Sequence, residues 1–565
     1  MAASMVGGAF LSAFLQVLFD RMASREILDF FCFRKLNIDL LKKLKLTLLS
    51  IKPLLDDAED KQITDPAVKE WLDELKDAVY IAEDLLDEIA FEASRCLLEA
   101  QDKADSSQDA SVAKLKDKKY IKKLSLEWSG CTSDSQIARE ILDNLQPHRN
   151  LQELVLAGYG GTRFPDWLGA QSLPNLVFLC LCDCDFCVIL PPLGQLPSLK
   201  ELCIKGMKSV VAVGPEFYGN CSVGIQSFQC LEILKFSGME QWQDWFFPDG
   251  EYSTGVFARL RELYIAKCDN VKVDIPFYLP FLEKLLIDGC QKLGASLLTA
   301  PPNNCCYEFL TDLEISWSLK SFPFDLFPNL RHLDLISCRK LESLTFSKSS
   351  SFHELKSLST IRIEECPNFY SFPAGEFPAP NLKFLILRNC CKLKSLPESM
   401  HRLLPSLGSL NILKCPDIDS FPEGGLPFSL SCISIRHCDK LFEQRMKWDL
   451  QRLTHLASLS ISSVIEDLES FPDEGLLPSW LERLYISECP NLRNLDGLVL
   501  GKLTSLQELG IYSCPEIQRL PEEGLPTSLT YLKIQSCPIL EKRCQREEGK
   551  DWQKIAHIPG LDIGY

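Results

Sequence analysis

The hydrophobic pattern of this chain is dominated by a short phrase in which apolar and polar positions alternate. The phrase reads LYISECPNL at 484–492, IYSCPEI at 511–517 and LKIQSCPIL at 532–540. When its copies are aligned, they follow the template L-x-x-[LI]-x-[LIF]-x-x-C. Alternation with a period of two predicts a short strand that buries one face, and the cysteine comes just after that strand.

Copies of this template recur over most of the chain. Clear copies start at Leu260, Leu282, Leu330, Leu358, Leu382, Leu407, Leu430, Leu481, Leu506 and Leu529. Weaker copies start at Ile121, Leu151, Leu176, Leu199, Leu231, Leu310 and Leu456. A template of this form that recurs about every 25 residues matches the leucine-rich repeat. The strands of such repeats bury their apolar face only against neighbouring coils. We therefore expect a curved solenoid with a parallel β-sheet on its concave face.

Prolines and glycines crowd the segments between the expected strands. Examples are SFPEGGLPFSL at 420–430, SFPDEGLLP at 470–478 and RLPEEGLPTSL at 519–529. Residues of these two types at such density exclude long helices. The convex side is therefore expected to be irregular or to consist of short 3-10 turns.

The cysteine at the ninth template position could be a metal ligand, half of a disulfide, a nucleophile or a packing residue. Cysteine is among the residue types most often buried, so we predict a ladder of free, packed thiols. Its members are Cys268, Cys290, Cys338, Cys366, Cys390, Cys415, Cys438, Cys489, Cys514 and Cys537. A zinc site needs paired ligands, and Cys180, Cys182, Cys184 and Cys187 come closest. We expect strand alternation to point them to opposite faces, and we predict no metal site.

The variable template positions are the candidates for a protein-binding surface on the concave face. Tyrosine and arginine on a rigid surface are enriched where proteins bind one another. The candidates are Glu262, Tyr264, Lys267, Arg362, Glu364, Glu365, Arg388, Asn389, Arg436, His437, Arg483, Tyr485, Glu488, Tyr512, Tyr531, Lys533 and Gln535. For each one, the alternative that it is merely a solvated side chain stays open.

Residues 1–98 have a different period. Apolar residues spaced alternately by three and four, at 41–58 and 68–89, predict two helices that pack as an antiparallel hairpin. An earlier amphipathic segment at 10–18 extends this to a four-helix coiled-coil bundle. Pro53 interrupts the first stripe, and a proline within a helix bends or restarts it.

Four carboxylates gather on the helix face that points away from the second stripe: Glu83, Asp84, Asp87 and Glu88. Like charges one turn apart repel by a few tenths of a kcal/mol per pair, roughly, and a basic partner surface would relieve that repulsion. A solvated acidic face is the alternative. An exposed helix offers no cleft for acid–base chemistry, so these carboxylates are not predicted to be catalytic.

The front segment and the repeats together resemble a known family. The segment LLSIKPLLDDAEDKQITDPAVKEWLDELKDAVYIAEDLLDEIAFE at 48–92, followed by repeats with EGGLP and SCP phrases, resembles the plant coiled-coil NB-LRR disease-resistance proteins, RPP13-like protein 1 group. The resemblance implies an Rx-type N-terminal domain in which AEDLLDE at 82–88 is the EDVID-type motif that contacts the repeats. It also implies that CQREEGKDWQKIAHIP at 544–559 caps the last coil.

One part of the family pattern has no counterpart in this sequence. The resemblance implies a nucleotide-binding ATPase module between the coiled coil and the repeats, with a phosphate-cradling G-x-x-x-x-G-K-[ST] loop, and no segment fits that loop. The polar stretch 99–119 joins the two parts and is too short for a domain. The expected organisation is therefore a coiled coil at 1–98, a linker at 99–119, about 17 repeats at 120–540 and a cap at 541–565.

The net charge and the cysteine content indicate which class of molecule this protein binds and in which cellular compartment it lies. A net charge of -17 argues against nucleic acid, because phosphate binding needs a basic face. The 25 cysteines accompany a single glycosylation sequon, at 220–222, which favours reduced thiols and a cytoplasmic protein. The apolar run at 6–19 lacks a preceding basic residue, so a signal peptide is not expected. Peripheral contact of the first helix with a membrane, and a nuclear location, stay open.

These observations favour a noncatalytic, immune-receptor-like protein without a cofactor. Its expected partner is a protein: a pathogen effector, a guarded host protein or another immune receptor, with self-association through the coiled coil. Alternatives are a decoy or adaptor of full-length receptors, a truncated copy without function, and a substrate-binding repeat module outside defence. An enzyme is not expected, because the seven histidines are scattered and assemble no nucleophile with its base.

Overall fold

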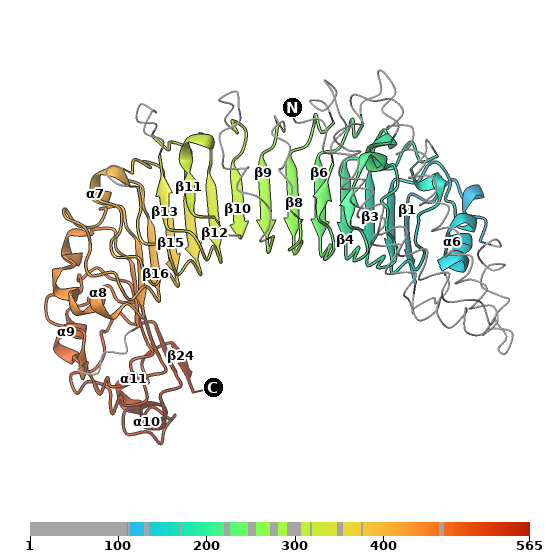
Figure 1. Cartoon of the computed structure of the whole chain (residues 1–565). Helices are drawn as coiled ribbons and strands as arrows, with labels where there is room; N and C mark the ends of the chain where they lie inside the picture. The colour runs from blue at the N-terminus through green and yellow to red at the C-terminus, as the bar shows by residue number, and fades with distance from the viewer. Residues whose placement is uncertain are drawn as a thin grey trace, which may run out of the picture. The chain divides into compact units, whose positions relative to one another are not determined.

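Parallel strands of mostly five residues dominate the computed structural model (Figure 1). The described residues fall into two compact units, within 1–297 and within 298–565, and each unit is treated by itself. The helices predicted within 1–98, with their acidic cluster, lie outside the described residues. The structure describes residues 110, 113–128, 135–169, 172–219, 227–246, 256–271, 279, 281–290, 307–316, 319–346, 354–373, 377–462 and 468–564.

In the first unit, consecutive coils each contribute one strand to a parallel ladder. The strands are β1 (Lys123–Glu127), β2 (Glu153–Ala157), β3 (Phe178–Cys182), β4 (Glu201–Lys205), β6 (Ile233–Ser237), β8 (Glu262–Ala266) and β9 (Lys284–Asp288). Behind the ladder, β5 (Ala212–Val213) pairs with β7 (Asp244–Trp245). The helices are η1 (Leu115–Asp117), α6 (Ser135–Asn144), η2 (Asp166–Leu168), η3 (Leu193–Gln195) and η4 (Pro215–Tyr218).

The second unit repeats the same design. Its ladder consists of β10 (Asp312–Ser316), β12 (His332–Ile336), β14 (Thr360–Glu364), β15 (Phe384–Arg388), β16 (Ser409–Leu413), β17 (Cys432–Arg436), β18 (Ser458–Ser462), β20 (Arg483–Ser487), β22 (Glu508–Tyr512), β23 (Tyr531–Gln535) and β24 (Gly560–Ile563). Short pairs join β11 (Ser321–Pro323) to β13 (Ser343–Thr345) and β19 (Ser470–Phe471) to β21 (Asn494–Leu495). The helices are η7 (Phe324–Leu326), α7 (Met400–Leu403), α8 (Asp439–Glu443), η8 (Arg445–Lys447), η9 (Leu450–Arg452), α9 (Gly497–Gly501), α10 (Pro538–Arg543) and α11 (Trp552–Ile555).

A one-for-one register stacks the apolar strand positions into a continuous core within each unit. In β22 and β23, Leu509 pairs with Leu532 and Ile511 with Ile534, and all four side chains are fully buried. The first, third and fifth strand positions, named the outer positions below, alternate with these buried ones. Each fully buried leucine or isoleucine contributes about 1.5–3 kcal/mol. The predicted solenoid, its parallel sheet and its short, irregular backside are confirmed.

The chain leaves most of the described ladder strands through a residue in the left-handed backbone region. Glycine occupies this position after some strands, as at Gly206 after β4, but most coils use another residue with φ between +52° and +56°. These residues are Asp183, Lys267, Ser337, Glu365, Asn389, Lys414, His437, Glu488, Ser513 and Ser536. The turn places the N–H against the next coil: Lys414 donates to the carbonyl of Arg436 at 2.9 Å. The sharp turn therefore lies one residue before the cysteine.

We expect Lys414→Val to destabilise the second unit by about 1–2 kcal/mol, because a β-branched residue at positive φ clashes with its own backbone. Lys414→Gly should be at least as stable as the original chain, since glycine enters this region freely. Urea unfolding midpoints of the full chain would measure both changes. Lys383→Val is the matched control, because Lys383 is exposed and has no positive φ. Equal midpoints for the two valine variants would contradict this account of the turn.

The repeated cysteines form a packing ladder. All ten are thiols outside any disulfide, with at most 1% exposure. Each Sγ lies 3.2–3.6 Å from the carbonyl oxygen two residues before it. Most also face a carbonyl of the preceding coil, as Cys338 faces Ile315 at 3.4 Å. These carbonyls also accept backbone N–H groups, as the Arg436 carbonyl does from Lys414, so each thiol adds a second, weak donor and fills a small buried space. The predicted packing role is confirmed.

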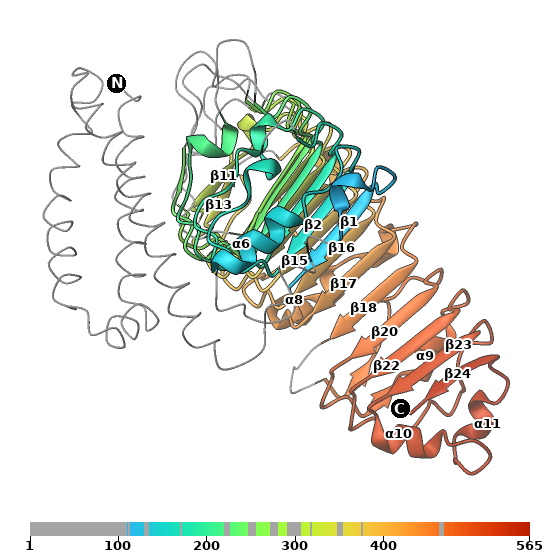
Figure 2. The same cartoon turned by 90° about the vertical axis from the view of Figure 1, so that its right-hand side faces the viewer.

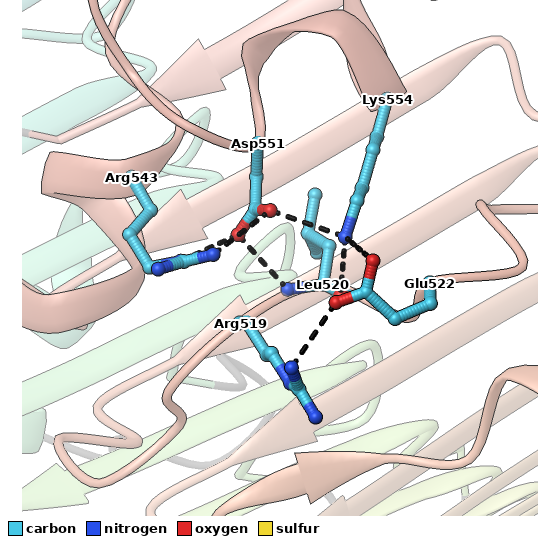
Figure 3. A network of polar contacts seen from close by, with 6 residues as sticks. All are labelled: Arg519, Leu520, Glu522, Arg543, Asp551 and Lys554. Atoms are coloured by element: carbon cyan, nitrogen blue, oxygen red, sulfur yellow. Dashed lines mark hydrogen bonds and ion pairs between the residues drawn. The ribbon is translucent and has the colours of Figure 1, made fainter.

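A polar network closes the far end of the second unit (Figure 3). Asp551, which precedes α11, is 1% exposed and accepts from Arg543 Nε at 2.7 Å and from the N–H of Leu520 at 3.3 Å. Lys554 Nζ lies 3.1 Å from the same carboxylate and 3.3 Å from Glu522. The network ties α10, α11 and the preceding coil together. The segment 541–565 also contains β24, which extends the ladder beyond β23 and was not predicted.

Candidate functional site

The predicted surface residues divide into two sets with different backbone positions. Most occupy outer strand positions: Glu262, Tyr264, Arg362, Glu364, Arg388, Arg436, Arg483, Tyr485, Tyr512, Tyr531, Lys533 and Gln535. The others lie in the left-handed turn after a strand: Lys267, Glu365, Asn389, His437 and Glu488. The second set borders the sheet, and the first set covers it. Contacts between strands then gather the outer residues into local clusters.

In the first unit, the cluster centres on Tyr264 of β8. Its hydroxyl is hydrogen-bonded to Glu262, and the ammonium groups of Lys235 and Lys284 lie 5.3 Å and 5.4 Å from its ring centroid. Lys235 is also bonded to Glu201 at 2.7 Å. Burial and the nearby carboxylate of Glu262 raise the pKa of Tyr264 to about 12. The ring is thus held between cations as a neutral phenol.

In the second unit, four charges alternate over β12, β14 and β15. Arg362 lies 3.8 Å from both Asp334 and Glu364, and Arg388 lies 3.3 Å from Glu364. Burial raises the pKa of Asp334, and the neighbouring guanidinium of Arg362 opposes that shift. Such partly exposed pairs contribute at most about 1 kcal/mol each to stability. Their main effect is to hold the arginines in defined orientations.

A charged bridge crosses over β18. The guanidinium of Arg436 and the ring Nε2 of His437 lie 2.8 Å and 2.7 Å from the carboxylate of Glu488, which is two strands further along the ladder. The strand between them has serine at every outer position, and Ser458 and Ser462 are buried. Small side chains on β18 therefore leave room for the bridge above it.

Three tyrosines gather near the end of the second unit, over strands that lie side by side in Figure 2. Tyr485, Tyr512 and Tyr531 come from outer positions of β20, β22 and β23. A Cβ atom at Gly510 would lie 2.6 Å from the ring of Tyr512 and 2.8 Å from that of Tyr485. The rings therefore lie against the backbone at Gly510. We name these three residues the tyrosine surface.

Glycine and paired charges fix the tyrosine surface at its border. A Cβ atom at Gly560 would lie 2.5 Å from the ring of Tyr531. Burial and a hydrogen bond to Glu508 raise the pKa of Tyr485 to about 12. Lys533 is bonded to Asp562 at 2.9 Å. Rigid aromatic rings with a polar tip are the usual anchors of protein interfaces, and here the charged residues beside them are already paired with each other.

Sequence reasoning missed several members of these clusters. Glu201, Lys235, Asp334, Glu508, Gly510 and Asp562 all occupy outer positions. Applying the strand alternation to every copy, weak ones included, would have found most of them. Gly510 carries no side chain, and only the register shows that two tyrosines flank it.

The strand geometry also corrects the interpretation of the cysteines at 180–187. Cys180 and Cys182 are two residues apart on β3, so they point to the same face, and their sulfur atoms lie 3.0 Å apart. Cys184 and Cys187, which follow the strand, are buried. The expectation that alternation separates all four was wrong. Across the described ranges, no group of three potential ligands is arranged to hold a metal ion.

Two family models match the front of the chain. Residues 10–120 match the Rx N-terminal domain, and residues 92–207 match the R13L1/DRL21 leucine-rich repeats. The two matches overlap, so no interval for another domain separates them in this sequence. No helix in the described part of the chain is long and apolar enough to cross a membrane.

Similar proteins have been described in plants. The chain is 33% identical over 305 residues to disease resistance RPP13-like protein 1 of Arabidopsis thaliana, covering 51% of this chain and 28% of that protein. A second Arabidopsis thaliana disease resistance protein is 26% identical over 479 residues, covering 80% of this chain and 32% of that protein. The chain thus spans about a third or less of these relatives. A solved leucine-rich-repeat protein of Leptospira interrogans aligns with 82% of this chain and 98% of its own at 18% identity and a TM-score of 0.36.

Proposed function

The chain combines an Rx N-terminal domain with the leucine-rich repeats of RPP13-like plant disease resistance proteins, and from this premise we propose that it is a noncatalytic recognition protein of plant defence. Its repeats bind a protein through outer strand positions. The coiled coil at 1–98 engages a signalling partner or a second copy, with the acidic residues at 83–88 facing a basic surface. The protein acts in the cytoplasm without a cofactor.

The tyrosine surface is the observation that carries this proposal. Its three rings come from neighbouring strands of a rigid ladder and are held against glycine backbone, so little side-chain freedom remains to be lost on binding. Ordered aromatic side chains that remain half-exposed at neighbouring strand positions have no role in the core of their own unit. A protein partner would bury them.

Affinity capture from plant tissue tests the proposal. The tagged full chain and a variant with Tyr485→Ala, Tyr512→Ala and Tyr531→Ala would be used as bait in extracts of infected and healthy tissue. We expect at least one protein to be retained by the original chain and lost with the triple variant. Leu498→Ala is the matched control, because Leu498 is 69% exposed on α9, outside the ladder. Identical captured sets for all three baits would contradict recognition through these tyrosines.

A second candidate role follows from the overlap of the two family matches. Without a nucleotide-binding module between coiled coil and repeats, the chain would have no ADP/ATP switch of its own, which favours a decoy or adaptor of full-length receptors. Expression in leaves with and without an intact relative would separate the roles. Cell death from this chain alone, abolished by substitutions that disrupt the amphipathic segment predicted at 10–19, would exclude a role that only dampens other receptors.

A further inference from the structure

A second group of cysteines lies on the outer face of the first unit and differs from the buried ladder. Cys180 and Cys182 occupy the third and fifth positions of β3, and Cys203 occupies the third position of β4. The register places Cys180 directly opposite Cys203. All three thiols are half-buried and free. They are therefore open to a small reagent, unlike the thiols of the ladder.

We propose that Cys180 and Cys203 form a peroxide-reactive thiol pair that a hydroperoxide converts into a disulfide between β3 and β4. This proposal does not rest on the proposed function. Opposed residues of neighbouring strands lie about 4.8 Å apart, within the Cα separation of about 4.4–6.8 Å that a disulfide spans. The Cα separation therefore allows the bond. The Sγ atom of Cys182 also lies 3.0 Å from that of Cys180. Its Cα, however, is about 6.6 Å away along the same strand, near the upper limit, so Cys182 is the poorer disulfide partner.

The surroundings assign different roles to the two thiols. A hydrogen bond from Cys180, assisted by the ammonium groups of Lys235 and Lys205, lowers the pKa of Cys203 to about 7. The same hydrogen bond and burial raise the pKa of Cys180. Because the thiolate is the nucleophile, Cys203 is the group that attacks, and Cys180 stays protonated beside it.

The reaction then follows in two balanced steps. The Cys203 thiolate attacks one oxygen of the hydroperoxide, the O–O bond breaks, and a sulfenic acid forms while hydroxide or alkoxide leaves and takes up a proton. The Cys180 sulfur next attacks the Cys203 sulfur. The S–O bond breaks, water leaves with the thiol proton, and the disulfide remains. The two thiols are oxidised together and one peroxide is reduced.

Oxidation would change the neighbouring outer cluster. Lys235 lies beside Cys203 and is bonded to Glu201, while its ammonium group also faces the ring of Tyr264. The disulfide removes the negative charge of Cys203 from beside Lys235. The cation then depends on Glu201 and Tyr264 alone, so the charge presented by this surface becomes more positive.

Peptide mass analysis of the full chain under nonreducing conditions tests the pair. The reduced protein would be treated with hydrogen peroxide, and the rate of loss of each thiol followed by alkylation. We expect one linked peptide joining Cys180 to Cys203, reversed by dithiothreitol. At pH 7, Cys203 should react several-fold faster than an ordinary thiol, because its lowered pKa leaves more of it as thiolate. Its alkylation by iodoacetamide should reach half its maximal rate at a lower pH than that of an unperturbed thiol, whose pKa is about 8.5.

Matched variants separate the pair from general oxidation. Cys432 is an equally half-buried thiol on an outer strand position, but its register neighbours are Ser409 and Ser458, so it should react slowly and form no link. Cys203→Ser should abolish the link and the fast reaction, Cys180→Ser should leave a sulfenic acid at Cys203, and Cys182→Ser should change neither. Circular dichroism would verify that each variant is folded. Loss of Cys203 at the rate of Cys432, or a link from Cys180 to Cys182 in its place, would overturn the proposal.

Discussion

Replacing Asp551 by alanine should destabilise the closing coil of the second unit by about 2–4 kcal/mol, somewhat below the 3–5 kcal/mol typical of a fully buried pair. The carboxylate is 1% exposed, whereas its partner side chains Arg543 and Lys554 are 29% and 19% exposed. Alanine would leave both cations without this acceptor and the N–H of Leu520 without its partner. A buried donor left unsatisfied is unfavourable by itself.

Urea unfolding of the full chain, together with the rate of proteolysis within 538–564, would measure this loss. Glu522→Ala is the control: its carboxylate is 64% exposed and contacts Lys554 and Arg519, so removing it should change stability by less than about 1 kcal/mol. The network would have no stabilising role if Asp551→Ala and Glu522→Ala were cleaved equally slowly.

The same residue predicts a pH dependence. Burial alone would raise the pKa of Asp551, but hydrogen bonds from Arg543 and Lys554 bring it below its ordinary value. A carboxyl group with a lowered pKa contributes stability above its unfolded pKa, about 3.9, and that contribution is lost as the pH falls through the folded value. As the pH falls below about 4, the free energy of unfolding of the original chain should therefore decrease more than that of Asp551→Ala.

Replacing Gly510 by leucine should weaken recognition strongly while leaving the ladder folded. A side chain there would occupy the space of the Tyr485 and Tyr512 rings, so both rings must swing away from the sheet. If the tyrosine surface binds a protein as proposed, this loss should weaken binding by about 2 kcal/mol or more, roughly thirtyfold in Kd. The measurement is titration of the purified chain against the partner that the capture experiment identifies.

Gly501→Leu is the control for this change. Gly501 ends α9, and a Cβ atom there meets no other atom within 4 Å. The substitution adds the same side chain at an open position and should leave binding unchanged. Unaltered affinity for Gly510→Leu would instead place the binding surface elsewhere on the repeats.

Local periodicity was sufficient to predict the fold of the repeats. Leucine and isoleucine at alternate positions, followed by cysteine, define a unit that can bury its apolar face only against another copy, so the template predicted the sheet, its direction and the packed thiols. Cap strand β24 escaped prediction because GLDIGY at 560–565 lacks the leading leucine and the cysteine. β24 is held in place by parallel pairing with β23, and the local sequence pattern does not reveal that pairing.

The candidate site was less accessible to sequence reasoning, because it depends on contacts between coils. Template positions identified Tyr485, Tyr512 and Tyr531 singly, but only the register brings Tyr485 and Tyr512 together over Gly510 and places Tyr531 against Gly560. The bridge from Arg436 to Glu488 spans residues 52 apart in the sequence and needs the serines of β18 below it. Strand alternation was wrongly expected to place Cys180 and Cys182 on opposite faces, and the position of Cys203 opposite Cys180 follows only from the register of β3 and β4.

The one-for-one register has a consequence for how such a chain can diversify. Each coil in a unit joins its neighbours through the same set of backbone bonds, whatever side chains it carries outward. Deletion or duplication of one whole coil by unequal recombination would therefore preserve the ladder. It would move the residues at all later outer positions by one strand along the ladder. A gene built in this way can acquire a new specificity in one genetic event, without passing through a misfolded ancestor.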